Sequence, residues 1–278
     1  MKKIIEKIKR LFILPINNLQ QSKNINVAVI SSNIKFFLKN TNLKVCFHKE
    51  YGLFSITDGN KKHYFGNLLR GLKMYSGGID KRAEKLFKSY SLDNITFTSD
   101  DIVIDCGANY ADLWLSLKGK INPSSYITFE PGIVEHECVK LNSPDGVHNR
   151  LGLDNKNSKV KFYVNERFGD SSLVEPLDYT HTIDVKTVSL SSYIAENNIS
   201  KIKLFKLEAE GYEPEILDGA KSILDKISYI AIDGGFERGL NEEETYSYLD
   251  KHLRAAGFEL VARHAIKEFR ALYKNTLS

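Results

Sequence analysis

The stretch Ile102-Val103-Ile104-Asp105-Cys106-Gly107-Ala108-Asn109 decides the fold of this 278-residue chain. Three consecutive β-branched apolar residues are typical of a buried strand, and the acid and glycine that follow mark its end. Because glycine has no side chain, the backbone N–H groups after Gly107 can approach a ligand at the start of the next helix. A carboxylate at Asp105 can accept charge-assisted hydrogen bonds from ammonium or hydroxyl groups. The stretch therefore predicts a strand, a binding loop and a helix, in that order.

Apolar runs and helical patterns alternate from residue 102 onward. This alternation predicts right-handed crossovers and a doubly wound, mainly parallel sheet in an α/β fold. The expected core strands are 102–105, 126–130, 147–151, 203–208, 228–233, 258–262 and 267–273, with helices over Glu213–Leu224 and Glu242–Ala256 and with extra strands at 160–164 and 183–188 in an insertion.

The chain is expected to divide into an N-terminal region over residues 1–94 and a larger domain over residues 95–278. Short apolar runs alternate with polar turns between residues 25 and 65, the first of them at 27–30, and predict a small antiparallel hairpin region. A helical pattern over residues 79–92 completes a small α+β cap.

Residues 1–14 have the pattern of a basic amphipathic helix. Their apolar side chains share one helical face, and lysines and an arginine take the other: Ile4, Ile5, Ile8, Leu11 and Phe12 against Lys3, Lys7 and Arg10. Two interpretations stay open. The segment packs on the domain or forms a solvated chain end, or it makes a peripheral contact with an anionic membrane or a partner.

Composition excludes several classes of protein. The net charge of +4 resides in the first ten residues, which hold five basic side chains and one acid, so that the remaining chain is balanced and does not resemble a nucleic-acid binder. No apolar run reaches the length of a membrane span. Three scattered cysteines without a CxxC pair indicate a reducing compartment and no zinc site, so a cytoplasmic protein is expected.

Acidic residues stand at the expected carboxyl ends of five core strands, where ligands bind in such a sheet. They are Asp105, Glu130, Asp154, Glu208 with Glu210, and Asp233; Asp112 lies one turn beyond the first. Glu130 is placed to accept hydrogen bonds from both hydroxyls of a ribose, and Asp154 is placed to contact the edge of an adenine. Strand-end acids can also cap the next helix, and for Glu208 and Glu210 both interpretations stay open.

The segments VIDCGAN, ITFEP, RLGLD, GDSSL, FKLEAEGYEPEIL and YIAIDGG, in this order, resemble the FkbM family of S-adenosylmethionine-dependent methyltransferases over roughly residues 79–262. The resemblance implies a class I, Rossmann-like domain that methylates oxygen, often on a sugar or a polyketide. It implies that these residues bind the cofactor: Asp105, Gly107, Ala108, Asn109, Glu130 and Asp154. Asp112, one turn beyond Asp105, is a further cofactor candidate from its place at the first strand tip. Ala111 departs from the family pattern, since most members have glycine there.

Methyl transfer to an alcohol needs a base or a metal, because alcohols are poor nucleophiles at neutral pH. Glu208, Glu210 and Asp233 are the candidates, at neighbouring strand tips. Clustered carboxylates either raise a pKa in one of them or recruit a hard cation such as Mg²⁺. We favour Glu210 or Asp233 as base or metal ligand, with Glu208 as partner and Lys206 as an ion-pair partner.

Two segments are candidates for contacts with the acceptor. Ser171 and Ser172 offer hydroxyls in a polar turn, and Arg238 lies in a glycine-containing loop. A sugar or sugar nucleotide is the leading acceptor, on the family resemblance. A polyketide hydroxyl and a non-catalytic binding protein on the same fold stay open, whereas a nicotinamide enzyme is disfavoured because no second or third glycine follows Gly107.

Overall fold

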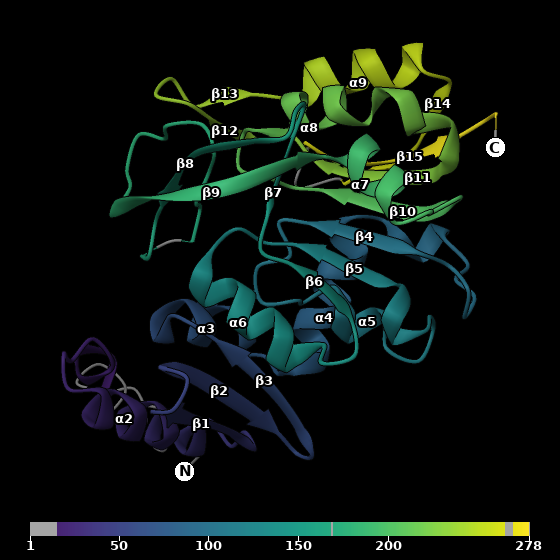
Figure 1. Ribbon diagram of the computed structural model, residues 1–278. Helices are drawn as coiled ribbons and strands as arrows, with labels where there is room; N and C mark the ends of the chain where they lie inside the picture. Colours follow the sequence, from purple (N-terminus) through teal and green to yellow (C-terminus); the bar gives the residue numbers. More distant parts are fainter. Residues whose placement is uncertain (1–15, 168, 265–268, 278) are drawn as a thin grey trace. The chain divides into compact units, whose positions relative to one another are not determined.

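A computed structural model describes residues 16–167, 169–264 and 269–277 of the chain (Figure 1). The chain divides into two compact units, Met1–Arg82 and Ala83–Ser278, here called the N-terminal and the C-terminal unit. The domain boundary expected between residues 94 and 95 stays a prediction. No helix in the described ranges is both long enough and apolar enough to cross a membrane.

The N-terminal unit is an antiparallel meander flanked by helices. Helix α2 (Ile25–Leu38) precedes strands β1 (Leu43–His48), β2 (Leu53–Asp58) and β3 (Lys61–Phe65), and α3 (Leu68–Tyr75) follows them. The strand order is β1-β2-β3, with both pairs antiparallel. The predicted antiparallel region is therefore present in this unit.

One expectation for this unit is wrong. Residues 27–30 were expected in a strand and lie in α2, because Asn24 caps the helix by accepting hydrogen bonds from the N–H groups of Asn26 and Val27. The helix also buries one face, formed by Ala28, Ser32 and Phe36 at intervals of four residues. The basic helix predicted over residues 1–14 lies outside the described residues.

The C-terminal unit is built on a seven-stranded sheet with the order β14-β15-β11-β10-β4-β5-β6. Its strands are β4 (Val103–Cys106), β5 (Tyr126–Phe129), β6 (Val147–Asn149), β10 (Ile202–Leu207), β11 (Ile227–Asp233), β14 (Phe258–Arg263) and β15 (Arg270–Asn275). The strands from β11 to β6 are parallel, and β15 runs antiparallel to both of its neighbours. The predicted α/β fold with a central, mostly parallel sheet is confirmed.

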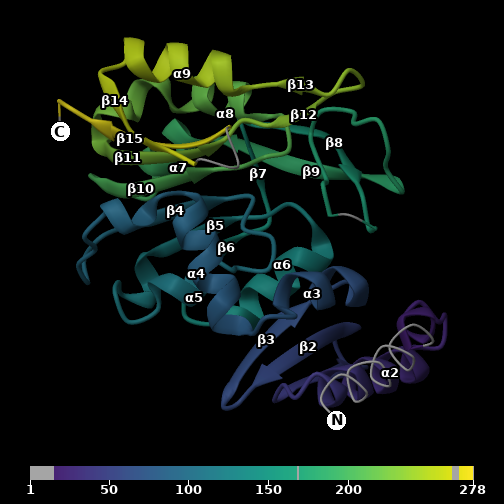
Figure 2. The ribbon, with the colours of Figure 1, turned by 180° about the vertical axis from the view of Figure 1, so that it is seen from behind.

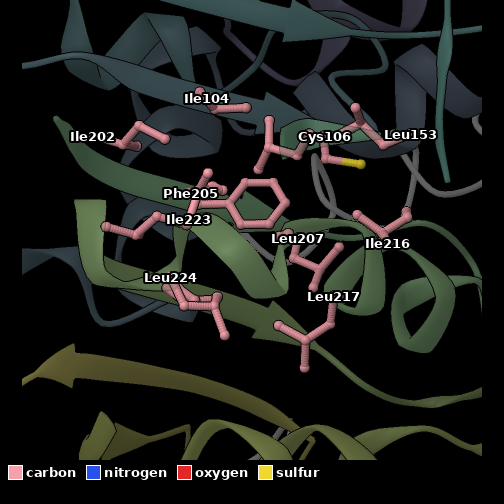
Figure 3. Packing of buried hydrophobic residues seen from close by; sticks show 14 of the residues in the cluster. Ile104, Cys106, Leu153, Ile202, Phe205, Leu207, Ile216, Leu217, Ile223 and Leu224 are labelled. Carbon is pink, nitrogen blue, oxygen red and sulfur yellow. The ribbon is translucent and has the colours of Figure 1, made fainter. Parts of the chain in front are cut away.

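Helices cover both faces of this sheet (Figure 2). They are α4 (Ile79–Ser89), α5 (Trp114–Leu117), α6 (Ile133–Asn142), α7 (Leu190–Glu196), α8 (Glu213–Ala220) and α9 (Tyr246–Ala255), with short 3-10 turns η1 (Leu92–Asn94), η2 (Pro123–Ser125) and η3 (Lys221–Lys226). Successive strand residues point to opposite faces. Figure 3 shows one face, where Phe205 and Leu207 of β10 pack with Ile216 of α8. On the other face, Leu204 packs in a cluster with Trp114.

Two smaller sheets complete the unit. Strands β7 (Gly152–Asp154), β8 (Ser158–Val164) and β9 (His181–Ser189) form one, in the order β7-β9-β8, and confirm the two strands predicted in the insertion. Strands β12 (Phe236–Arg238) and β13 (Glu243–Glu244) form the other. The helix expected from residue 242 therefore begins only at residue 246, because the residues before it pair with β12.

Candidate functional site

The connections of the main sheet reverse direction between β4 and β10. Strands β5 and β6 follow β4 on one side, whereas β10 and β11 lie on the other. In open α/β sheets, ligands bind beyond the carboxyl ends of the strands at such a point. The register places Lys206 of β10 beside Asp105 of β4. The residues that follow these two strands therefore form the candidate site.

A chain of ion pairs crosses the carboxyl end of the sheet. Lys206 Nζ lies 3.0 Å from Asp105 Oδ1 and 2.9 Å from Glu208 Oε2. Arg270 Nη2 lies 2.8 Å from the other Glu208 oxygen, and Arg270 Nε donates to Asp233. We call these five residues the ion-pair chain. It joins four neighbouring strands through buried or largely buried charges, and it confirms Lys206 as an ion-pair partner.

Electrostatics in the ion-pair chain leave Glu208 a weak base. Burial works against ionisation, but Lys206 and Arg270 hold the pKa of Glu208 well below its usual range. A carboxylate with such low proton affinity accepts a proton from an alcohol poorly. Asp233 is bound by Arg270 in the same way. Of the three predicted candidates for the base, only Glu210 is left outside these pairs.

The predicted metal set of Glu208, Glu210 and Asp233 is not assembled. Among the described residues, no three side chains of His, Cys, Asp or Glu are grouped so as to hold a metal ion. The physical reason is that Lys206 and Arg270 occupy both oxygens of Glu208 and one oxygen of Asp233. The residues at these strand tips therefore do not fit a bound Mg²⁺.

Glu210 lies in a tightly fixed turn after β10. Its φ of 50° is in the left-handed region, which costs a residue other than glycine roughly 1 kcal/mol. Glu213 Oε1 holds the turn by accepting hydrogen bonds from the N–H groups of Ala209 at 2.7 Å and Gly211 at 3.2 Å. Ser172 Oγ donates to the carbonyl oxygen of Glu210 at 2.7 Å. Strained backbone that is fixed in this way is frequent at active sites.

The charged groups around Glu210 favour its protonated form. Burial raises the pKa of Glu210 well above its ordinary value, and the carboxylates of Glu237 and Glu208 add to the shift. Burial, followed by the charge of Asp233, also raises the pKa of Glu237 to about 8. A carboxylate with a raised pKa can take up a proton near neutral pH. Sequence reasoning missed Glu237, since a single acid away from the expected strand ends carries no local signal.

Ser171 and Ser172, predicted to bind the acceptor, have partners within the protein. Ser171 Oγ accepts a hydrogen bond from the N–H of Asn165 at 2.9 Å. Ser172 is buried, and its Oγ also accepts from the N–H of Val174 at 3.1 Å. Ser172 therefore stabilises the turn at Glu210.

Arg238, predicted to bind an anionic acceptor, is held by an acid that sequence reasoning did not consider. Its guanidinium makes a two-pronged ion pair with Glu215, at 2.9 and 2.7 Å. Its Nη1 also donates to the carbonyl oxygen of Gly211 at 2.6 Å. A Cβ on Gly211 would lie 2.5 Å from Arg238 Cα, so this position requires glycine. Arg238 therefore supports the same turn as Ser172.

The loop after β4 does not present the free N–H groups that were expected. Gly107 and Ala108 donate to the carbonyl oxygen of Phe129, at 3.0 and 3.4 Å. The N–H of Asn109 donates to Glu130 Oε2 at 2.8 Å. Gly107 is needed for close packing, because a Cβ there would lie 2.0 Å from the carbonyl oxygen of Glu208. Its φ of 68° also favours glycine.

Glu130 has the geometry to bind a pair of hydroxyl groups. It follows β5, and its two carboxylate oxygens accept N–H groups from Asn109 at 2.8 Å and Gly132 at 2.9 Å. Each oxygen keeps a further lone pair. Burial, with Glu135 as the next cause, raises the pKa of Glu130 to about 8. These residues fit the ribose of S-adenosylmethionine, whose hydroxyls would donate to the remaining lone pairs.

The other acids assigned to the cofactor are buried. Asp112 is 4% exposed, and Asp105 accepts a hydrogen bond from the hydroxyl of Tyr126 besides its contact with Lys206. Asp154 ends β7 in the small sheet, where its Oδ1 accepts a hydrogen bond from the hydroxyl of Tyr212 at 2.9 Å. The structure thus places Asp154 outside the main sheet. A cofactor contact by Asp105, Asp112 or Asp154 stays a prediction.

Ala111 occupies a position that suits glycine. Its φ is 57°, in the left-handed region, and its side chain is fully buried. A residue with a Cβ pays a conformational cost there. The structure therefore gives a backbone reason for the glycine that the family resemblance implies at this position.

Comparisons with known proteins find a match among family models and among solved structures. A family model described as the Methyltransferase FkbM domain matches residues 105–260, which is more than half of the chain. Among solved structures, the chain is similar to methyltransferase FkbM from Methylobacillus flagellatus KT, with 13% identity and a TM-score of 0.45. The similarity covers 93% of this chain and 57% of that protein, so this chain spans less than two thirds of its length. No curated protein matches. On the match to the family model, the chain belongs to the FkbM methyltransferase family.

Proposed function

We propose that the chain is an S-adenosylmethionine-dependent O-methyltransferase that transfers a methyl group to a hydroxyl of a sugar or sugar nucleotide. Membership of the FkbM family supports methyl transfer. The strand order, with one antiparallel strand between two strands of the opposite direction, supports a class I, Rossmann-like fold. The sugar acceptor rests on the resemblance of the chain to this family.

The observation that carries the proposal is the position of Glu130. Its carboxylate is fixed by two backbone N–H groups beside the point where the sheet reverses direction. Two fixed acceptor oxygens complement the two neighbouring hydroxyls of a ribose. When bound, S-adenosylmethionine supplies an electrophilic methyl group on a sulfonium.

In this proposal Glu210 is the base. Its backbone is fixed, and its raised pKa makes the carboxylate a strong acceptor for the proton of the acceptor hydroxyl once Glu210 has lost its own proton. Glu208 is ionised beside it and is held by Lys206 and Arg270, so it maintains the negative potential that keeps the proton affinity of Glu210 high. Methyl transfer also requires that donor and acceptor be aligned and that water be excluded.

Calorimetric titration of the full chain with S-adenosylmethionine tests the cofactor site. Three proteins are compared: the unchanged chain, Glu130→Ala, and Glu196→Ala as a matched control at an exposed acid that ends α7. We expect Glu130→Ala to weaken binding by about 10- to 100-fold, because it removes two hydrogen bonds from the ribose hydroxyls and each contributes about 0.5–1.5 kcal/mol. The control should bind as the unchanged chain does. Circular dichroism confirms that each variant is folded.

Two results would count against the proposal. Absence of binding by the unchanged chain would contradict the cofactor assignment. Equal binding by folded Glu130→Ala would show that the ribose hydroxyls are bound elsewhere. Release of S-adenosylhomocysteine in the presence of candidate sugar nucleotides then tests the acceptor, and Glu210→Gln tests the base.

A further inference from the structure

Charge is segregated along this chain. Residues 1–82 carry 16 Lys and Arg against four Asp and Glu, whereas residues 83–278 carry 23 against 31. The N-terminal unit thus has a net charge of +12 and the C-terminal unit one of −8. No acidic residue occurs between Glu6 and Glu50. This acid-free stretch contains helix α2 and strand β1.

Helix α2 presents a row of apolar side chains to solvent. Val27, Ile30, Ile34 and Phe37 follow one another at intervals of three, four and three residues and therefore share one helical face. They are 36%, 59%, 46% and 78% exposed, respectively. We call these four residues the α2 stripe. An exposed apolar row of this length marks an interaction site more often than an isolated exposed residue does.

The orientation of α2 is fixed by contacts on its other side. Asn33 makes a reciprocal pair of hydrogen bonds with the backbone of Val45 in β1, at 2.9 and 2.7 Å. Ala28 and Phe36 are buried on that side. Figure 1 draws α2 beside β1, and the two elements are in contact. The helix therefore cannot turn to bury the α2 stripe without breaking these contacts.

Lysines flank the α2 stripe at both ends. Lys23 precedes the helix, Lys39 forms its C-cap, and both are exposed. Apolar side chains between terminal lysines suit the boundary between lipid headgroups and acyl chains, where ammonium groups remain near phosphates while the apolar face is buried. From this geometry we propose that the α2 stripe is a docking surface for an anionic lipid membrane. The proposal does not depend on methyl transfer.

Charge complementarity and the chemistry of the stripe select this occupant. An acid-free region with five lysines between residues 16 and 49 is attracted to anionic lipids, and each lysine near the surface strengthens the attraction. The phosphates of a nucleic-acid duplex would pair with the lysines but would leave the apolar side chains of the stripe exposed, since phosphates and base edges offer little apolar surface. An anionic lipid surface can pair with the lysines and also bury the apolar side chains.

Vesicle co-sedimentation of the full chain tests the proposal. Vesicles of phosphatidylcholine alone are compared with vesicles that also contain phosphatidylglycerol, at low and high salt. The Ile30→Ser/Phe37→Ser double variant removes the centre and the end of the stripe. Leu177→Ser/Leu240→Ser is the matched control, with two leucines of similar exposure (66% and 61%) in the C-terminal unit. Lys23→Gln/Lys39→Gln removes the flanking charges.

We expect binding only to the anionic vesicles. It should fall by about tenfold or more in Ile30→Ser/Phe37→Ser and in high salt, and measurably in Lys23→Gln/Lys39→Gln. The control should bind like the unchanged chain. Because the two α2 residues are exposed, their replacement should leave the unfolding temperature within a few degrees.

Five results would overturn the proposal. The first is no binding to anionic vesicles, and the second is undiminished binding by Ile30→Ser/Phe37→Ser. A large fall in the unfolding temperature of that variant would indicate that residues 1–15 of this chain cover the stripe. Concentration-dependent self-association that the double variant abolishes would identify a second copy as the occupant. Equal affinity for a nucleic-acid duplex, unaffected by the serine substitutions, would attribute vesicle binding to charge alone.

Discussion

Lys206→Met is the most informative single change in the ion-pair chain. Lys206 is 3% exposed and contacts two carboxylates, those of Asp105 and Glu208. It also donates to the carbonyl oxygens of Cys106 and Gly107, at 3.1 and 2.9 Å. Methionine retains most of the volume but none of these bonds. Arg270 still binds Glu208 in the variant, whereas Asp105 keeps only the Tyr126 hydroxyl among the bonds described above.

The expected cost follows from the burial of Asp105. Removing one partner of a buried ion pair costs about 3–5 kcal/mol, because the other charge is left uncompensated. Asp105 is 1% exposed, so solvent does not screen this loss. For a unit of this size, the unfolding temperature should fall by roughly 10 °C. The free energy of unfolding is measured by urea titration, with fluorescence of Trp114, the single tryptophan, which is buried in the same unit.

The loss of stability in Lys206→Met should grow as the pH rises. Burial raises the pKa of Asp105 above its ordinary value, and Lys206 opposes that rise, so the variant raises the pKa further. A carboxyl group whose folded pKa exceeds its unfolded pKa contributes stability that is present at low pH and is lost as the pH rises through the folded value. Lys206→Met should therefore be closer to the unchanged chain at pH 5 than at pH 8.

Lys203→Met is the matched control on the same strand. Its ammonium lies 3.8 Å from Asp101, and its side chain is 23% exposed, so its loss should cost about 1 kcal/mol or less. The reasoning is refuted if Lys206→Met costs no more than Lys203→Met. It is also refuted if the deficit of Lys206→Met is the same at pH 5 and pH 8.

Three further predictions concern the loops after β4 and β10. Gly107→Ala should destabilise the chain by about 2 kcal/mol or more and weaken S-adenosylmethionine binding, because the Cβ of the alanine would meet the Glu208 carbonyl oxygen at a position of positive φ. A loss of less than about 1 kcal/mol in a urea titration would contradict this prediction. Burial raises the pKa of Glu213 to about 7, above its unfolded value, so the stability that Glu213 contributes falls as the pH rises through 7. Glu213→Gln should therefore reduce the difference between the free energies of unfolding measured by urea titration at pH 5.5 and pH 8.5. An unchanged difference would contradict this prediction. Ser172→Ala should cost about 1 kcal/mol through the lost bond to Glu210 and leave cofactor affinity unchanged in calorimetry; a large loss of affinity would instead assign Ser172 to the cofactor site.

Sequence periodicity predicted the main sheet well, because its strands are short apolar runs between turn residues. It failed at residues 27–30, where the run Val-Ala-Val-Ile is equally compatible with a strand and a helix. The side chain of Asn24 and the burial of Phe36, eight residues after Ala28, decide for a helix. A local run of four residues does not contain either contact.

The carboxylates of the site were predictable from their places at strand ends, but their partners were not. Arg270 binds Glu208 across 62 positions of sequence, and only the antiparallel pairing of β15 with β11 brings the two together. The same holds for Ser172, which reaches the Glu210 carbonyl from the insertion. The strand-end acids therefore indicated the location of the site. Which of them are held in ion pairs, as Glu208 and Asp233 are, and which one favours its protonated form, as Glu210 does, depends on tertiary contacts.

The segregation of charge between the two parts of the sequence has a practical consequence for handling the protein. Its net charge of +4 predicts weak retention on a cation exchanger at neutral pH. Residues 1–82, with a net charge of +12, should nevertheless hold the chain on such a resin to high salt. Residues 83–278 carry −8 and should by themselves adsorb to an anion exchanger. A single proteolytic cut between the two parts would thus yield fragments that separate on opposite resins, which makes the boundary between them easy to map.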